Sequence, residues 1–301
     1  MFSKAPINEL VVTAGDARIF SENIGEPDAP AVLLIMGAMA SGVWWPREFC
    51  ATLASRGRFV IRYDHRDTGR STSYSPGVPA YSVETLADDA LAVLNACGIY
   101  EAHVAGMSLG GYIAQLLALK SPARVRTLTL IASERLASAD PSMPGMDSRI
   151  LAYHARAAKL DWTDRSVVIE YQLGAWRLLS GSGRAFDEVL IRALAEEDWD
   201  RTPNPLTPFN HAGLTEPAGW VNRLDEIQTP SLIIHGTDDR VLPYAHGLAL
   251  HRALSNSRLL TLEGAGHELH PVDWPAIIDS IVEHTASDPA DGQSTRRRSR
   301  S

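Results

Sequence analysis

The sequence feature that most constrains the fold is the segment Gly106-Met107-Ser108-Leu109-Gly110, in which a serine lies between two glycines. An apolar, β-prone run at 103–105 precedes it, and a helix-favouring run at 112–119 follows it. A serine at a sharp turn from strand to helix has a strained backbone, and glycines two residues away on either side let the strand and the helix pass closely. The segment therefore predicts a strand, a tight turn and a helix, with the Ser108 hydroxyl exposed at the apex. The alternative interpretation is a glycine-rich turn with an incidental serine.

Composition and charge restrict the class of protein. The 301 residues are 45% hydrophobic and 21% charged, which is enough core material for one large α/β domain or two modest ones. The formal net charge of −8 argues against nucleic acid or an anionic membrane as a partner. The longest apolar runs, such as 31–36 and 231–234, have the length of strands and are too short to cross a bilayer. No apolar stretch typical of a signal peptide follows residues 1–6, so we expect a cytoplasmic protein.

The two cysteines, Cys50 and Cys97, both fall in predicted helices among apolar neighbours. We interpret them as ordinary buried thiols, with a disulfide as the alternative. No pattern in the sequence indicates an oligomeric state, which we leave unknown.

Strand-like runs and helical patterns alternate over the first 133 residues. Strands are expected at 9–13, 17–21, 31–36, 59–64, 103–105 and 125–133. Helices are expected at 45–57, at 82–98 with Ser82 as its cap, and after Gly110. The first two strands, joined by a turn at 14–16, predict an antiparallel hairpin. The later alternation is typical of a parallel sheet with helices on both faces.

The character of the chain changes after this alternation. Residues 136–224 contain no strand-like run; their helical patterns lie at 147–160, 166–179 and 183–197. Strand patterns return at 230–236 and 258–262, with helices at 243–254 and 273–285. We predict an α/β fold, a mostly parallel twisted sheet flanked by helices, with its core at 1–135 and 225–285 and a helical cap insertion at 136–224. The polar residues 286–301 predict a disordered tail, whose basic end has nucleic-acid contact as the alternative.

A serine nucleophile needs a base, and His267 has the best context among the ten histidines. Serine is a poor nucleophile at its free pKa, so a histidine must accept its proton and a third group must orient that histidine. His267 follows the strand at 258–262 in a glycine loop directly before the last helix. His270 is the nearest alternative, and His235, at the end of a strand, is expected to be structural.

The acid is expected in the loop after the strand at 230–236. That loop contains Asp238 and Asp239, and its sequence frame favours Asp239 as the acid and Asp238 as a turn residue. Glu134, after the preceding strand, is another candidate. The order Ser108, Asp239, His267 is typical of one topological class of serine hydrolase.

Acyl transfer also needs hydrogen-bond donors for a developing oxyanion. The backbone N–H of Leu109, at the start of the helix after the serine, is one expected donor. The second is expected from the small-residue loop after the strand at 31–36, and we assign it to the backbone N–H of Ala38; a plain turn is the alternative.

These residues carry a family resemblance. The motif around Ser108, with Asp239 and His267, resembles the triad of the α/β-hydrolase fold superfamily over about 9–285. Segments 36–38, 45–49 and 60–71 are similar to the aclacinomycin (anthracycline) methylesterase group. The resemblance implies a carboxylic-ester hydrolase, a serine esterase with an acyl-enzyme mechanism and no metal or organic cofactor.

The resemblance also implies that Ala38 and Leu109 form the oxyanion hole. Ala38 stands where that methylesterase group is expected to have glycine, so the backbone donor is kept while the pocket narrows by a methyl group. Asp67 stands where many α/β hydrolases have glycine, and we interpret Asp64, Arg66 and Asp67 as a structural ion-pair loop and not as catalytic residues.

The substrate pocket is expected between the sheet and the insertion. Candidate lining residues, with plain core packing as the alternative for each, are Trp44 or Trp45, Met107, Trp176, Phe209 and His211. We expect a small-molecule ester substrate, small to medium in size and hydrophobic, with methyl esters included. Lactonase, carbon–carbon bond hydrolase, cofactor-free perhydrolase and acyltransferase activities share the triad and stay open, as does a non-catalytic ligand-binding protein.

Overall fold

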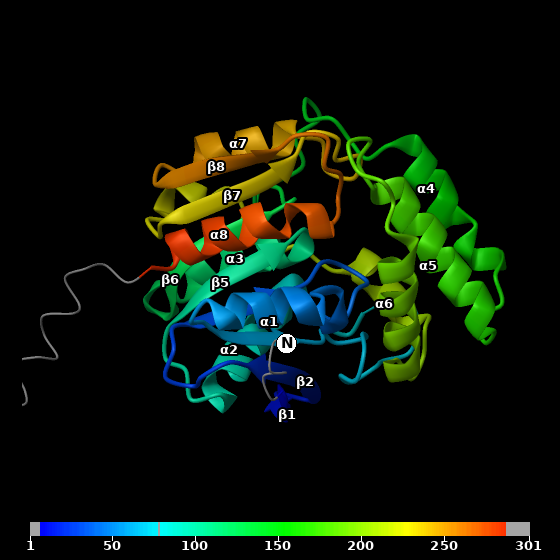
Figure 1. Cartoon of the computed structure of the whole chain (residues 1–301), viewed down its shortest axis with the longest axis horizontal. Helices are drawn as coiled ribbons and strands as arrows, with labels where there is room; N and C mark the ends of the chain where they lie inside the picture. The colour runs from blue at the N-terminus through cyan, green and yellow to red at the C-terminus, as the bar shows by residue number, and fades with distance from the viewer. Residues whose placement is uncertain (1–6, 78, 287–301) are drawn as a thin grey trace, which may run out of the picture.

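The core of the protein is a single eight-stranded sheet (Figure 1). A computed structural model of the chain describes residues 7–77 and 79–286. The strands are β1 (Ile7–Ala14), β2 (Ala17–Ile24), β3 (Ala31–Ile35), β4 (Phe59–Tyr63), β5 (Ala102–Met107), β6 (Val125–Ile131), β7 (Ser231–Gly236) and β8 (Ser257–Leu262). Their order is β1-β2-β4-β3-β5-β6-β7-β8; β1 and β2 are antiparallel to their neighbours, and the other six strands are parallel. The predicted mostly parallel sheet is confirmed.

Helices cover both faces of the sheet because successive strand residues point to opposite sides. On β3, Leu33 and Ile35 pack in the core beneath α2 (Val83–Ala96), α3 (Leu109–Lys120) and α7 (Ala245–Ala253). The alternate residues Val32 and Leu34 pack beneath α1 (Arg47–Ser55) and α8 (Trp274–His284). All five residues of β3 are buried, as expected for a strand covered on both faces.

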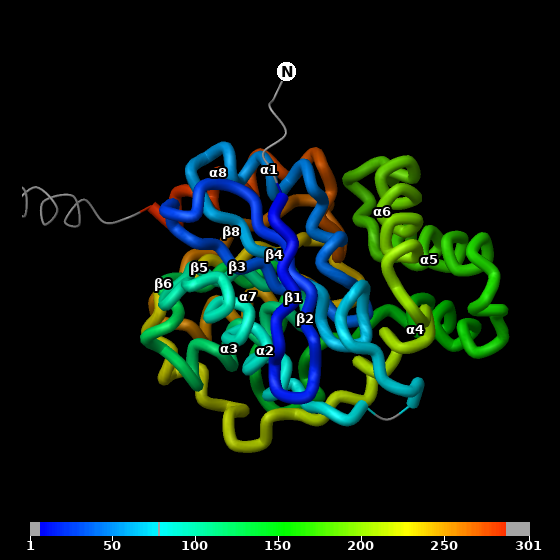
Figure 2. The backbone as a smooth tube through the Cα atoms, turned by 90° about the horizontal axis from the view of Figure 1, so that it is seen from below, coloured from blue at the N-terminus to red at the C-terminus, as the bar shows by residue number. Residues whose placement is uncertain are grey.

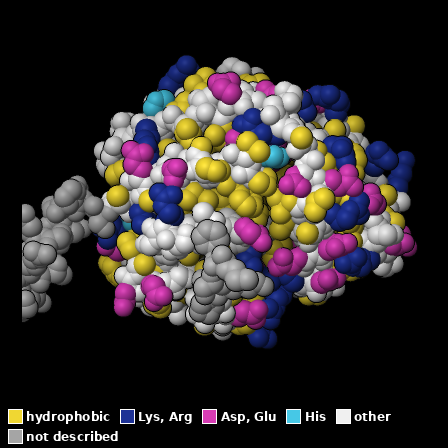
Figure 3. Space-filling model, viewed as in Figure 1, with side chains coloured by type: hydrophobic (Ala, Val, Ile, Leu, Met, Phe, Trp, Pro, Cys, Tyr) yellow, Lys and Arg dark blue, Asp and Glu magenta, His cyan; other side chains and the backbone are white. Residues whose placement is uncertain are grey.

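Three further helices lie between β6 and β7 in the chain: α4 (Ser148–Ala155), α5 (Arg165–Leu179) and α6 (Glu188–Arg201). They stand together to one side of the sheet in two perpendicular views (Figures 1 and 2). Hydrophobic side chains gather in the middle of the face in Figure 3, between the part of the molecule built on the sheet and the part that carries these helices. We call the segment 136–224 the cap.

Several element bounds differ from the predicted ones for local reasons. The predicted helix at 45–57 begins only at Arg47, after Pro46, because residues Gly42–Trp44 form a separate 3-10 turn. The predicted helix at 183–197 begins at Glu188, since Asp187 caps it by accepting a hydrogen bond from the N–H of Leu190 at 3.0 Å. Ser82 caps α2 through a capping box with Thr85.

Cys50 is a free, buried thiol whose pKa burial raises to about 11, and Cys97 is a free thiol that is half-buried. Across 7–77 and 79–286, no helix is long and apolar enough to cross a membrane. The predicted disordered tail, 286–301, lies outside the described residues except for Ala286.

Candidate active site

Ser108 occupies a strained turn between β5 and α3. Its φ of 53° and ψ of −120° lie in a region that residues other than glycine rarely adopt. Such a conformation costs on the order of 1–3 kcal/mol and persists only where its surroundings hold it. Here the Ser108 N–H donates to the Ile131 carbonyl at 2.9 Å, and the Ser133 hydroxyl donates to the Ser108 carbonyl at 2.8 Å. The turn is therefore held from β6 and from the residues just after it.

The flanking glycines are required by close backbone packing. A Cβ atom added at Gly106 would lie 2.1 Å from the Gly110 carbonyl oxygen, and one at Gly110 would lie 2.1 Å from the Ile35 carbonyl oxygen. Gly111, for which the sequence suggested no role, is equally restricted, because its Cβ would lie 2.5 Å from the Ser133 hydroxyl. Three elements, β5, α3 and β3, thus approach one another at Ser108.

His267 and Asp239 form a buried hydrogen-bonded pair at the carboxyl ends of β8 and β7. Nδ1 of His267 lies 2.8 Å from Oδ2 of Asp239. The other carboxylate oxygen accepts the backbone N–H groups of Val241 at 2.9 Å and Leu242 at 2.8 Å. Burial alone would raise the pKa of Asp239, but the neighbouring His267 and His235 outweigh it and hold that pKa well below its usual range. Asp239 is therefore a carboxylate that can orient the His267 ring.

The loop that carries His267 packs backbone to backbone against the end of α5. The His267 N–H donates to the Leu179 carbonyl at 2.8 Å. The Glu268 carboxylate accepts the Ser180 hydroxyl at 2.7 Å and the Gly181 N–H at 2.9 Å. The cap thereby fixes the position of the histidine loop, which no sequence motif had indicated.

The alternative residues lie in other surroundings. Asp238 hydrogen-bonds the Ser182 hydroxyl and N–H at the surface. Nε2 of His270 donates to the Ala185 carbonyl at 2.9 Å. His235 donates to the Leu242 carbonyl at 2.7 Å and lies 3.5 Å from Asp239. Glu134 lies 3.5 Å from His246. None of these four residues is among those that line the cavity shared by Ser108 and His267.

Two backbone N–H groups near Ser108, those of Ala38 and Leu109, have no hydrogen-bond acceptor among the described residues. The loop after β3 runs alongside the serine, since a Cβ added at Gly37 would lie 3.3 Å from the Ser108 Cβ. Leu109 is the first residue of α3, so its N–H has no intrahelical acceptor. In the loop, the Met39 N–H donates to Nδ1 of His211 at 2.9 Å, whereas the Ala38 N–H has no acceptor in the described part of the chain.

Ser108 and His267 line one cavity of about 190 Å³ between the sheet and the cap. Its wall is mostly apolar and aromatic, formed by Met36, Trp44, Met107, Trp162, Tyr171, Trp176 and Phe209. Gln172 and His154 add polar groups to this wall. Met107, Trp176 and Phe209 lie where the sequence analysis placed them. No motif distinguishes Trp162 and Tyr171, so the sequence analysis missed them.

Trp45 does not line this cavity, so the prediction that it forms part of the pocket wall is wrong. Its ring is fully buried against Phe49, at a centroid distance of 5.6 Å. The 3-10 turn that ends at Trp44 points that residue toward the cap, where it stacks on Trp176 at 4.5 Å. Trp44, the other candidate, is therefore the wall residue.

A second, wider cavity of about 580 Å³ also reaches Ser108 and Ala38. Its lining includes charged or titratable side chains, namely Glu134, Arg135, Asp140, Glu216 and His246. His211, a predicted pocket residue, borders this second cavity and not the aromatic one. Ser108 thus lies where the aromatic cavity meets a wider cavity whose wall includes charged side chains.

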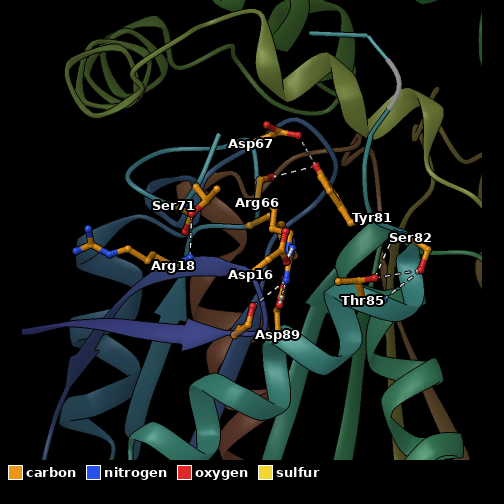
Figure 4. A network of polar contacts seen from close by, with 12 residues as sticks. Asp16, Arg18, Arg66, Asp67, Ser71, Tyr81, Ser82, Thr85 and Asp89 are labelled. Atoms are coloured by element: carbon orange, nitrogen blue, oxygen red, sulfur yellow. Dashed lines mark hydrogen bonds and ion pairs between the residues drawn. The ribbon is translucent and has the colours of Figure 1, made fainter. Parts of the chain in front are cut away.

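The predicted ion-pair loop joins several elements (Figure 4). Arg66 donates to both oxygens of Asp89, at 2.7 and 2.9 Å, and to Asp16 at 2.7 Å. Asp64 pairs with Arg201 of α6 at 2.8 Å. Within the described part of the chain, Asp67 makes hydrogen bonds and no ion pair: it accepts from the Tyr81 hydroxyl at 2.7 Å and from the cap residue Asn210 at 2.8 Å. The loop therefore fastens the cap to the core.

Comparison with known proteins defines the class. The family described as the alpha/beta hydrolase fold matches residues 30–273, and the chain belongs to this family. It is 35% identical to a rhodomycin D methylesterase of Streptomyces sp. strain C5 over 292 residues, covering 91% of this chain and 97% of that protein. It is 39% identical over 261 residues to a protein of Azorhizobium caulinodans named as a carbamate hydrolase, covering 86% and 91%.

Solved structures agree on the fold. An esterase of Exiguobacterium antarcticum superposes with a TM-score of 0.76 at 21% identity, covering 93% of this chain and all of that one. The predicted α/β-hydrolase fold and the resemblance to the methylesterase group are confirmed. The relatives support a hydrolase acting on a small molecule. Among the described residues, no group of three His, Cys, Asp or Glu side chains is arranged to hold a metal ion.

Proposed function

We propose that the protein is a serine esterase that hydrolyses carboxylic esters with Ser108, His267 and Asp239 as its catalytic triad. The observation that carries the proposal is the convergence of three features around Ser108. These are the strained serine turn, the histidine held by a buried carboxylate, and the N–H groups of Ala38 and Leu109, which have no acceptor among the described residues. Serine acyl transfer requires a nucleophile, an oriented base and oxyanion donors.

The proposed reaction proceeds through an acyl-enzyme. Nε2 of His267 accepts the Ser108 proton as Oγ attacks the ester carbonyl, and the Asp239 carboxylate stabilises the resulting imidazolium through Nδ1–H. The Ala38 and Leu109 N–H groups donate to the oxyanion. The alcohol leaves with the proton from His267, and water then hydrolyses the acyl-enzyme with the same base.

The cavity supports a hydrophobic acyl group and a small alcohol, with methyl esters as the first candidates. Aromatic rings form much of the wall of the 190 Å³ cavity, so an apolar or aromatic acyl group is favoured there. The methylesterase named among the relatives supports a methyl ester, although the insertion that shapes the cavity has no motif specific to one substrate.

The direct test is the Ser108→Ala variant with p-nitrophenyl acetate, followed by a panel of methyl, ethyl and benzyl esters. We expect Ser108→Ala to lose nearly all turnover and all labelling by a fluorophosphonate, while its thermal unfolding midpoint stays close to that of the parent. Parental turnover in Ser108→Ala would rule out the assignment. Labelling of the parent without steady turnover of any ester would favour a ligand-binding protein.

A second candidate is carbamate hydrolysis, favoured by the 39% identical relative. Attack on a carbamate carbonyl needs the same nucleophile and oxyanion donors as attack on an ester. A matched pair of p-nitrophenyl acetate and p-nitrophenyl carbamate separates the two candidates through the ratio of kcat/KM. Lactones and carbon–carbon bond substrates extend the same panel to the remaining alternatives.

A further inference from the structure

The loop that supplies the Ala38 N–H is held by a residue of the cap. Met39, the next residue, has a φ of 64°, in the left-handed region. A residue with a side chain is disfavoured there, so the conformation needs support. That support comes from His211, whose Nδ1 accepts the Met39 N–H at 2.9 Å. The two residues are 172 positions apart in the chain.

The partners of His211 define one tautomer of its ring. The Met39 N–H can only donate, so Nδ1 must carry a lone pair. Nε2 lies 2.9 Å from the Arg66 carbonyl oxygen, which can only accept, so Nε2 must carry the proton. Burial lowers the pKa of His211 to about 4, so the ring is neutral at physiological pH. A protonated ring would turn a second N–H toward Met39 and break the contact.

His211 is itself fixed to the core through Asp67. It lies in the 3-10 turn Thr207–Gly213, from which Thr207 donates to the Asp67 carbonyl at 3.0 Å and Asn210 donates to the Asp67 carboxylate at 2.8 Å. Tyr81 donates to the same carboxylate, as Figure 4 shows. Asp67 therefore anchors the segment that carries His211, at a position where many α/β hydrolases are expected to have glycine.

We propose that His211 is a positioning residue for the oxyanion hole, holding the Met39 N–H so that the Ala38 N–H stays free and directed toward Ser108. The inference rests on the proposed esterase function. His211 acts through the loop and does not contact the reacting atoms. Because an oxyanion donor interacts more strongly with the transition state than with bound substrate, loss of this support lowers kcat and leaves KM nearly unchanged.

Two substitutions separate the contacts of His211. In His211→Asn, the amide oxygen lies near the former Nδ1 and can still accept the Met39 N–H, while the bond to Arg66 is lost. In His211→Gln, the amide nitrogen reaches toward the former Nε2 and keeps the bond to Arg66, while the Met39 N–H loses its acceptor. Each variant therefore removes one of the two hydrogen bonds of this residue and keeps the other.

The experiment measures kcat and KM for p-nitrophenyl acetate and the inhibition constant of phenylboronic acid, which forms a tetrahedral adduct on a reactive serine. We expect His211→Gln to lose roughly tenfold to a hundredfold in kcat, with an equal loss of boronate affinity and a KM within about twofold. His211→Asn should stay within about threefold of the parent in both quantities. His103→Asn, a buried histidine that contacts Thr127 in the core, controls for loss of stability without loss of kcat.

Equal losses in the two His211 variants, a loss confined to KM, or parental kcat in His211→Gln would each overturn the proposal. Failure of the esterase function itself has a different signature, because Ser108→Ala would then keep the parental rate. If His211→Gln is unaffected while Ser108→Ala is inactive, only the positioning role fails.

Discussion

Asp239 uses its two carboxylate oxygens for different purposes: Oδ2 lies 2.8 Å from Nδ1 of His267, and Oδ1 accepts two backbone N–H groups of its own loop. The two hydrogen bonds from the loop backbone hold the carboxylate in place independently of His267. The acid is therefore rigid, and the imidazole takes its orientation from it. Asp238, the neighbouring residue, faces Ser182 at the surface. Asp238 and Asp239 therefore form a matched pair, because they have the same side chain and differ only in position.

Asp239→Asn should fold and lose most of its turnover. An asparagine keeps the shape of the side chain but cannot stabilise the imidazolium, and loss of this acid in a serine triad lowers kcat by roughly 10⁴-fold. Steady-state hydrolysis of p-nitrophenyl acetate measures the effect. Asp238→Asn should retain a parental kcat, since its partner lies outside the cavity; equal losses in both variants would refute the assignment of the acid.

Gly110→Ala should destabilise the protein far more than an ordinary glycine substitution. The new methyl group would lie 2.1 Å from the Ile35 carbonyl oxygen, so α3 would have to move away from β3. Overpacking of a tight core site costs about 1–3 kcal/mol, occasionally more. Urea unfolding monitored by circular dichroism measures the difference.

Gly219→Ala is the control for this substitution. A Cβ at Gly219 would have no neighbour within 4 Å, and Gly219 is not among the glycines with positive φ. We expect its unfolding free energy to change by less than about 1 kcal/mol. Similar changes in the two variants would mean that the close approach at Gly110 does not constrain the fold.

The sheet, the turn at Ser108 and the pairing of Asp239 with His267 could be anticipated from short sequence patterns and the strand order. The core strands carry short apolar runs, and β3, in which every residue is apolar and buried, is the clearest case. The turn at Ser108 can be recognised in the sequence because backbone sterics require glycine two residues before and two residues after the serine. Asp239 and His267 follow strands that must end at the same edge of a parallel sheet, so their approach depends on topology more than on detailed packing.

Only part of the cavity wall could be anticipated, because the causes of the rest are not local. Trp44 and Trp45 are adjacent, and a short 3-10 turn decides which one reaches the cap. The contact of His211 with Met39 joins an irregular loop of the core to an irregular segment of the cap, and neither has a periodicity that predicts it. The same holds for the bonds between Glu268 and the end of α5.

Trp176→Ala should change acyl selectivity. Trp176 stacks on Trp44 at 4.5 Å and forms part of the wall of the aromatic cavity. An aromatic acyl group would lose this wall, whereas an acetyl group is too short to depend on it. We expect kcat/KM for p-nitrophenyl benzoate to fall about tenfold or more relative to p-nitrophenyl acetate. Trp220→Ala, in the other core cluster, should leave the ratio unchanged; an unchanged ratio in Trp176→Ala would place the acyl group elsewhere.

Asp198 of α6 should make stability depend on pH in a direction unusual for a carboxylate. It is buried against Ser41 and Trp44, which donate to it at 2.5 and 3.1 Å, and burial raises its pKa to about 6 despite these bonds. The folded state therefore keeps a proton that the unfolded chain releases near pH 4. Between about pH 4 and pH 6 the contribution of Asp198 to stability falls as pH rises, and it is constant above that window.

Asp198→Asn removes this pH-dependent contribution. The free energy of unfolding of the variant should therefore rise relative to that of the parent as the pH increases from 4.5 to 7.5, by at most about 3 kcal/mol. Urea unfolding of both proteins at the two pH values measures the change. Asp200→Asn, on the same helix but exposed, should show no such pH-dependent difference. If the variant and the parent differ in stability by the same amount at both pH values, Asp198 is already ionised at pH 4.5. A charged carboxylate would then hold the buried contact between α6 and the loop after β3.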